Sequence, residues 1–286
     1  MSLEPWLRRH PLLAYCAAVY GISWGGILVV AGARGFDLVR LQAADTALIF
    51  VAMLLGPSVG GLAMTAVLDG QAGLRRLRSS LMRWRVGLRW YAVALLTMPM
   101  LLLIVLWPLS ATVDGAFAPR FQWPLFAIGL IAGSFEEIGW TGFATPRLLA
   151  LKRLFIAGLS LGLVWALWHA PVDFRQNFNA LGAAWLLEFA AFYVAALTAY
   201  RLLMTWVYAN TQSLLLAVLM HASYTGWLFV LYPATSFEQG LVWQTALAVS
   251  LWGVVAMVMA VARFAHRRSR LATQRPVTAE ELRGLR

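Results

Sequence analysis

Two adjacent carboxylates, Glu136 and Glu137, lie within an apolar segment of the sequence, AGSFEEIGWTGFATPRL. A charge at the centre of a bilayer costs about 2.5–3.5 kcal/mol even on lenient insertion scales, so acids in such segments usually have a function. Adjacent residues of a helix point about 100° apart, so the two side chains cannot face one target equally. We therefore expect one glutamate to do chemistry and the other to support it or a neighbouring helix.

Two histidines lie within other apolar segments. His169 follows Trp165 by four residues in LVWALWHAPVDF, so these two side chains share a helix face. Pro171 comes soon afterwards and predicts that the helix bends or ends there. His221 lies in TQSLLLAVLMHASYTG, with Thr225 one turn later on the same face. We expect no basic residue in the middle of any span, which leaves the two glutamates without an evident salt-bridge partner at their depth.

One carboxylate and two imidazoles from three segments fit two chemistries. Glu136, His169 and His221 could hold zinc with water as the fourth ligand. They could equally work without metal, the carboxylate as general base, one imidazole orienting the water and the other donating to an oxyanion. No HExxH motif is present, so the zinc hypothesis lacks its usual helical signature. Proton or ion transport and a purely structural role are the alternatives, and Glu188 is better explained by a hydrogen bond between helices.

Membrane-spanning helices have to position these residues. Of the 286 residues 61% are hydrophobic and 12% charged, whereas soluble domains are nearer half apolar and a quarter charged. Apolar runs longer than about 18 residues predict transmembrane helices. We therefore predict an all-α polytopic membrane protein with about eight spans. The expected spans are Pro11–Ala31, Ala44–Val67, Trp90–Ser110, Pro124–Ala144, Phe155–Val172, Ala180–Val207, Ser213–Tyr232 and Leu241–Ala262.

The basic residues predict the orientation of this single domain. We expect a transmembrane domain over 1–262 and a basic cytoplasmic tail over 263–286. Nineteen of the 23 basic residues fall at the termini and in alternate loops if Arg201 is counted at the end of its span. The positive-inside rule then places both termini in the cytoplasm. The arginine-rich stretch 74–90 has apolar residues at helical spacing and is expected in the headgroup layer, so the charge of +11 predicts lipid contact and no nucleic acid.

The three segments together resemble the CPBP family, the CAAX proteases and bacteriocin-processing enzymes of membranes. The first family motif, two glutamates followed after three residues by arginine, corresponds to EEIGWTG at 136–142. The second, an aromatic residue followed four positions later by histidine, corresponds to WALWHAP, from Trp165 to Pro171. The third, histidine followed four positions later by asparagine or a small polar residue, corresponds to HASYT, from His221 to Thr225.

The resemblance implies a role for each matching residue. Glu136 corresponds to the glutamate that activates water, and Glu137 to its supporting neighbour. His169 would assist with the water. His221, with Thr225, would stabilise the oxyanion. The resemblance favours a glutamate mechanism without a cofactor, and any zinc would be held by Glu136, His169 and His221.

The resemblance covers roughly residues 124–230, the protease-like core. Within this core, two departures from the family pattern affect these expectations. Thr141 stands where the family usually has arginine, which removes a fixed cation near the glutamates. Thr225 stands where asparagine is commonest, and its hydroxyl can still donate one hydrogen bond. A divergent, inactive member of the family is therefore an alternative.

These observations lead to one functional hypothesis and one alternative. The chain is expected to be an intramembrane endopeptidase of a bacterial inner membrane, a hydrolase that cleaves a peptide or a membrane-protein segment with a glutamate-activated water. The alternative is a proton-coupled transporter, or a non-catalytic immunity or partner protein, on the same scaffold. Transport predicts broken helices at paired positions in two halves of the chain. The possible breaks at Gly56–Pro57 and Pro99 do not match in this way.

Overall fold

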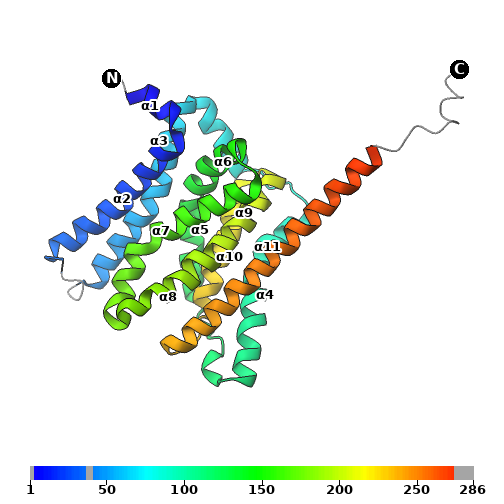
Figure 1. Cartoon of the computed structure of the whole chain (residues 1–286). Helices are drawn as coiled ribbons and strands as arrows, with labels where there is room; N and C mark the ends of the chain where they lie inside the picture. Colours follow the sequence, from blue (N-terminus) through cyan, green and yellow to red (C-terminus); the bar gives the residue numbers. More distant parts are fainter. Residues whose placement is uncertain (1–2, 37–40, 274–286) are drawn as a thin grey trace, which may run out of the picture.

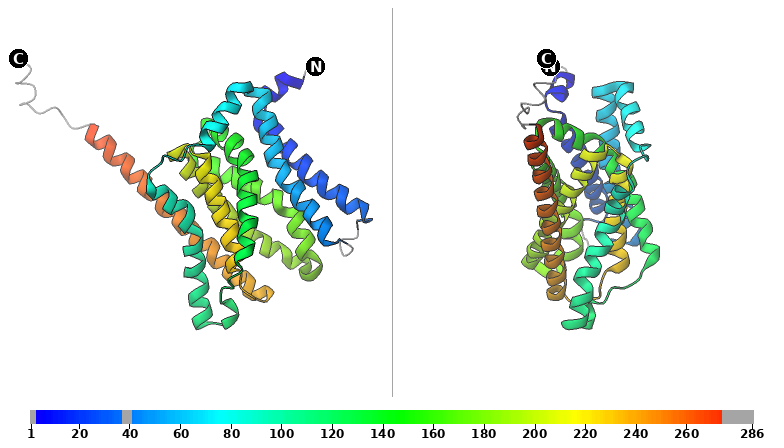
Figure 2. Two further views of the ribbon diagram at one scale, coloured as in Figure 1. Left: turned by 180° about the vertical axis from the view of Figure 1, so that it is seen from behind. Right: turned by 90° about the vertical axis from the view of Figure 1, so that its right-hand side faces the viewer.

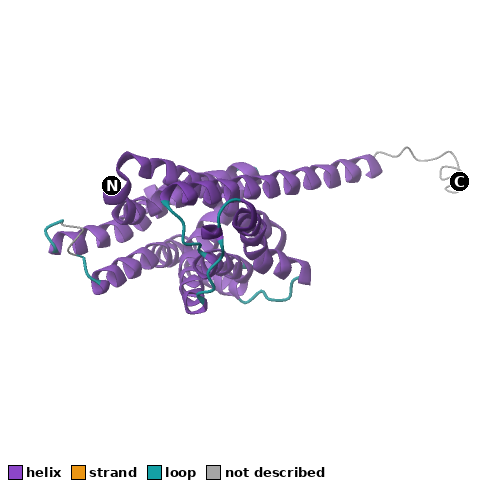
Figure 3. Cartoon of the chain, turned by 90° about the horizontal axis from the view of Figure 1, so that it is seen from below, coloured by secondary structure: helices purple, strands orange, loops and turns teal. Residues whose placement is uncertain are grey.

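The computed structural model describes residues 3–36 and 41–273, with the backbone alone for 175–181 and 264–273. All regular structure in these residues is helical (Figure 3). The α-helices are α1 (Leu3–Arg9), α2 (Pro11–Ala33), α3 (Ala43–Leu81), α4 (Leu88–Thr112), α5 (Phe126–Gly139), α6 (Thr145–Leu151), α7 (Leu154–Leu181), α8 (Trp185–Phe189), α9 (Thr198–Thr211), α10 (Leu214–Leu231) and α11 (Phe237–Thr273). The predicted all-α polytopic membrane fold is confirmed.

Seven helical segments of the described chain are long and apolar enough to cross a membrane. The remaining expected span, Pro124–Ala144, which is the fourth along the chain, is not a single long α-helix. Its α-helical part, α5, has only 14 residues and runs into a π-helical turn over Trp140–Ala144 before α6 begins. A π turn adds one residue to a turn and is frequent at functional sites. Here it begins directly after the glutamate-bearing turn of α5.

One glycine and one proline have different effects on the long helices α3 and α7. Gly70 interrupts α3 with a left-handed φ of 58°, a conformation that glycine adopts without steric cost. The basic stretch after Gly70 therefore leaves the direction of the preceding span. Pro171, in contrast, lies inside α7, which continues to Leu181. Of the expectation that the helix bends or ends at this proline, the second alternative is wrong, whereas Phe155–Val172 correctly locates the apolar part of α7.

A seam of small residues joins α5 to α10. Side chains on Gly129 or Gly133 would collide with the α10 backbone, and a Cβ built on Gly133 would lie 2.7 Å from the Val218 carbonyl oxygen and 2.8 Å from the Ala222 nitrogen. Glycines four residues apart allow two membrane helices to approach this closely. The close approach brings the glutamate-bearing turn of α5 against the histidine of α10.

A second glycine seam joins α7 to α9. A Cβ on Gly162 would lie 2.8 Å from the Cα atom of Thr198, and one on Gly158 would lie 3.0 Å from the Cα atom of Leu202. The two seams place α5, α7, α9 and α10 around a common centre, with α2 and α3 side by side on one flank and α11 on the other (Figure 1).

The first and last described helices, α1 and the C-terminal part of α11, lie at one end of the bundle. In Figures 1 and 2 α1, the bend of α3 and the C-terminal part of α11 all lie toward the same end. The cytoplasmic placement of both termini and of the arginine-rich stretch stays a prediction.

Candidate active site

Glu137 forms the centre of a buried polar network. Its side chain is 0% exposed, and Arg201 donates to it through both terminal nitrogens, at 2.8 Å to Oε2 and 2.7 Å to Oε1. The Thr141 hydroxyl donates to Oε2, and the His221 Nδ1–H donates to Oε1 at 2.7 Å. Two oxygens therefore receive four hydrogen bonds, which fixes the carboxylate in one orientation.

Arg201 corrects the expectation that the glutamates have no basic partner. Arg201 lies in the first turn of α9, is 0% exposed and forms a bidentate ion pair with Glu137. It does not lie at a cytoplasmic span end, so the basic residues that support the predicted orientation number eighteen. It also corrects the expectation about Thr141, because the site keeps a fixed cation that comes from another helix.

His221 is oriented by this network. Because its Nδ1–H donates to Glu137, its Nε2 faces the other glutamate, 4.0 Å from Oε1 of Glu136. That separation is too long for a direct hydrogen bond and suits a bridging water. His221 is 2% and Glu136 5% exposed, so the pair is shielded from bulk solvent and lipid.

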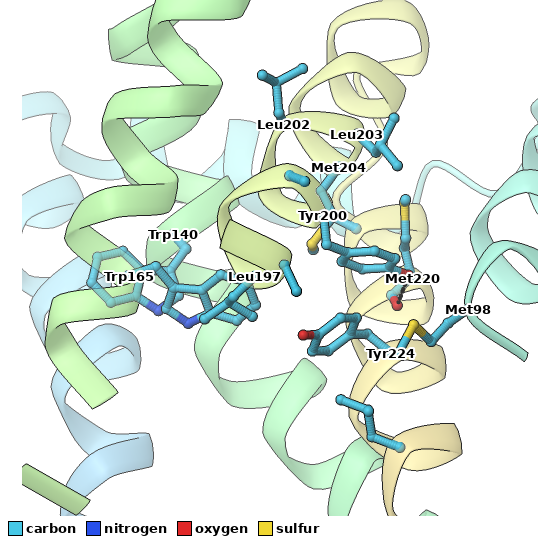
Figure 4. Packing of buried hydrophobic residues seen from close by; sticks show 14 of the residues in the cluster. Met98, Trp140, Trp165, Leu197, Tyr200, Leu202, Leu203, Met204, Met220 and Tyr224 are labelled. Carbon is cyan, nitrogen blue, oxygen red and sulfur yellow. Dashed lines mark hydrogen bonds between the residues drawn. The ribbon is translucent and has the colours of Figure 1, made fainter. Parts of the chain in front are cut away.

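Trp165 connects the remaining groups of the site. Its indole nitrogen donates to Oε2 of Glu136 at 2.9 Å, and the guanidinium of Arg201 lies 3.9 Å from its ring centroid. The rings of His169 and His221 approach it edge-on, with centroids at 5.6 and 5.1 Å. Figure 4 labels this tryptophan and Trp140, the residue that opens the π turn after α5.

His169 lies beside this group, on α7. Its Nδ1–H donates to the carbonyl oxygen of Trp165 at 2.9 Å, which leaves Nε2 as the nitrogen available to a ligand. The ring also contacts Trp168 and Tyr193, at centroid distances of 4.8 and 5.1 Å. The aromatic residue and the histidine of the second motif thus reach the site from one face, as their spacing predicts.

The third motif contributes two hydroxyls with different surroundings. Thr225 is half-buried on α10, and its hydroxyl has no hydrogen-bond partner among the described residues. Tyr224, the preceding residue, is 3% exposed, and its hydroxyl is buried without a partner in the same part of the chain. Figure 4 shows the Tyr224 hydroxyl directed toward the side of the bundle where Trp140 and Trp165 lie.

The residues named for zinc do not form a ligand set in this conformation. Among the described residues no three histidine, cysteine or acidic side chains are grouped as metal ligands. His169 and His221 both use Nδ1–H as a donor, so Nε2 is the atom of each ring through which a metal would have to be bound.

Glu188 lies apart from this cluster. Gln244 of α11 donates to Oε1 of Glu188 at 3.1 Å. The interpretation of this acid as one that bonds between helices is confirmed.

Sequence reasoning missed one residue of the site, Arg201, and one contact, the hydrogen bond from Trp165 to Glu136. An arginine inside the expected span Ala180–Val207 was itself a signal, because a buried cation needs a carboxylate at its own depth. Trp165 was assigned to a motif, but its indole N–H was not considered as a donor to Glu136.

Comparisons with known proteins bear on this arrangement. Residues 118–227 match the family model described as type II CAAX prenyl endopeptidase Rce1-like. The chain is also similar to CAAX prenyl protease 2 of Methanococcus maripaludis, with 27% identity over 154 residues. This similarity covers 48% of the chain and 54% of the relative, so the chain spans about half the length of the curated protein it matches.

The family match includes all three motifs and also Arg201. It confirms the resemblance drawn from the motifs and supports assignment to a protease family. Residues 118–227 of this multi-pass membrane chain are thus similar to the type II CAAX prenyl endopeptidases, as the three motifs predict.

Proposed function

We propose that the chain is an intramembrane endopeptidase in which Glu136 activates the attacking water. The observation that carries the proposal is the buried gap of 4.0 Å between Oε1 of Glu136 and Nε2 of His221. A water there would contact a carboxylate that can accept its proton, which is the geometry that general-base catalysis requires. The ring of His169 packs against Trp165, as the ring of His221 does, and its Nε2 is free of protein hydrogen bonds in the described chain, so it would be able to orient the same water.

The hydrogen bonds of the cluster support a role for His221. Glu137 accepts the Nδ1–H of His221 and is itself held by Arg201, so the imidazole is fixed with Nε2 toward Glu136. We propose that Nε2–H of His221 donates to the developing oxyanion.

The proposed reaction has two steps. The water gives a proton to Glu136 while its oxygen bonds to the peptide carbonyl carbon, and the carbonyl π electrons move onto oxygen. The oxyanion accepts hydrogen bonds from His221 and from the Thr225 hydroxyl. The carbonyl then re-forms, the C–N bond breaks, and Glu136 returns its proton to the leaving nitrogen, which gives a carboxylic acid and an amine.

The substrate is proposed as a peptide or a membrane-protein segment. The matched family and the relative are named as CAAX prenyl endopeptidases or proteases. For this chain we propose a leader peptide or a membrane-protein tail, in which the bond to be cleaved is likewise a peptide bond. The arginine-rich composition supports a bacterial inner membrane as the location. Both termini would face the cytoplasm.

The test is cleavage of a peptide library by purified protein in detergent. Glu136→Gln keeps the shape of the side chain and removes the base, so turnover should fall by about 10²–10⁴-fold. Glu188→Gln is the matched control, because it makes the same change at an intramembrane acid outside the site. Cleavage by Glu136→Gln at the wild-type rate would sink the assignment. A wild-type protein that cleaves nothing would favour the non-catalytic alternative.

A further inference from the structure

Arg201 differs from an ordinary buried ion-pair partner in how its donors are used. Both terminal nitrogens bind Glu137, whereas Nε is buried without a partner among the described residues. The guanidinium therefore meets the carboxylate end-on, and its plane lies over the ring of Trp165. This placement leaves one donor unsatisfied, which is an unfavourable feature for a residue whose only purpose is stability.

The contacts of Arg201 reach both glutamates. It fixes the two oxygens of Glu137, one of which also accepts the Nδ1–H of His221. It stacks on Trp165, whose indole N–H donates to Glu136. A single guanidinium thus determines the orientation of the imidazole and supports the donor that holds the base.

A buried ion pair is weak support for stability, because desolvation of the two ions offsets most of their attraction. An apolar pair of similar volume would serve the packing of α9 equally well. The arrangement is better explained by orientation, since a planar fork holds a carboxylate in one rotamer and one plane.

We propose that Arg201 is a positioning residue for the peptidase reaction, acting through Glu137 on His221 and through Trp165 on Glu136. The inference rests on the proposed function and extends it to a residue that the three motifs do not contain. Arg201 touches neither the water nor the scissile bond. Its loss should therefore lower kcat and leave KM nearly unchanged.

The geometry offers a direct way to test this role. The Thr141 hydroxyl donates to the same Oε2 of Glu137 and lies 3.4 Å from a terminal nitrogen of Arg201. An arginine placed at 141 would start from a position already in contact with Glu137. The exchange variant Thr141→Arg/Arg201→Thr keeps the composition of the site and moves the guanidinium from α9 to the π turn.

We expect three levels of activity in the peptide assay. Arg201→Thr should lower kcat by about 10²-fold, since a misplacement of about 1 Å has that cost. Arg201→Lys keeps the charge but loses the fork, and a loss of about tenfold is expected. The exchange variant should recover to within about tenfold of wild type. Thr198→Val, which removes an unpartnered hydroxyl from the same helix, is the control that should change nothing.

The His221 ring gives a readout that does not depend on turnover. In protein labelled with ¹⁵N at histidine, Arg201→Thr should shift the Nδ1 signal of His221, because Glu137 loses its anchor. The exchange variant should restore the wild-type signal. A purely structural role would alter protein stability and leave this signal in place in the folded fraction.

Several results would overturn the proposal. They are a folded Arg201→Thr protein with wild-type kcat, a folded exchange variant as inactive as the single variant, or an unchanged His221 signal. If Arg201→Thr, Arg201→Lys and the exchange variant all fail to fold, the role is structural and the proposal is wrong. Failure of the proposed function looks different, because the wild type itself then lacks cleavage that depends on Glu136, while the His221 signal still tests the positioning.

Discussion

Gly133→Ala tests whether the close approach of α5 and α10 assembles the site. The new Cβ would lie 2.7 Å from the Val218 carbonyl oxygen, whereas ordinary contact begins at 3.4 Å. The atoms that the new Cβ would meet belong to the α10 backbone, so the helices have to separate by about 0.7 Å, the difference between these two distances. A shift of that size along the seam would lengthen the 2.7 Å bond between His221 and Glu137 to about 3.4 Å, where a hydrogen bond is weak.

The expected effect is larger on catalysis than on folding. Overpacking of this kind costs about 1–3 kcal/mol of stability, whereas a displacement near 1 Å at a catalytic group costs about 10²-fold in rate. The assay is peptide cleavage together with thermal unfolding in detergent. Gly25→Ala on α2 is the matched control, because a Cβ there meets nothing within 4 Å. Wild-type kcat in a folded Gly133→Ala protein would refute the view that this seam sets the active geometry.

Three further predictions concern the oxyanion, the metal and the topology. Thr225→Val should lower turnover by about 10²–10³-fold with folding intact, and Thr225→Asn should preserve turnover. If Tyr224→Phe, measured in parallel, loses more turnover than Thr225→Val, the buried phenol of Tyr224 is the oxyanion donor and the proposed role of Thr225 is wrong. Peptide cleavage should persist when a metal chelator is added. If the protein instead binds about one zinc per chain, and if chelator abolishes cleavage and added zinc restores it, the reaction is metal-dependent. A C-terminal tag should be digested by protease added to inside-out vesicles, and its protection would contradict a cytoplasmic C-terminus.

The fold class was predictable because hydropathy alone carries it. In lipid every backbone polar group needs an internal partner, so long apolar runs have to form helices. The expected spans accordingly coincide with long helical segments of the structure except over Pro124–Ala144, where the α-helix has only 14 residues. A π-helical stretch occurs there, over Trp140–Ala144, and another occurs over Ala190–Leu197, and apolar content does not encode such a local change of period.

The residue types of the candidate site were predictable from the sequence, but only some of the contacts between these residues were. Glu136, Glu137 and His221 stood out because ionisable groups inside apolar segments are costly. Their mutual contacts follow from the seam of small residues between α5 and α10, which the sequence displays as glycines four residues apart. The same spacing recurs at Gly158 and Gly162, which pack against α9, so the spacing alone does not indicate which two spans touch.

The sequence by itself determined that this chain is a helical membrane protein with acids and imidazoles inside its spans. These residues can be recognised one by one in the sequence, because an ionisable side chain inside an apolar span is costly and therefore rare. Only the tertiary structure decided that Glu137 pairs with Arg201, more than sixty positions away, and that Thr141 leaves room for this pairing. A buried charge requires a partner but does not specify from which helix it comes, and that choice depends on how closely the helix backbones can pack.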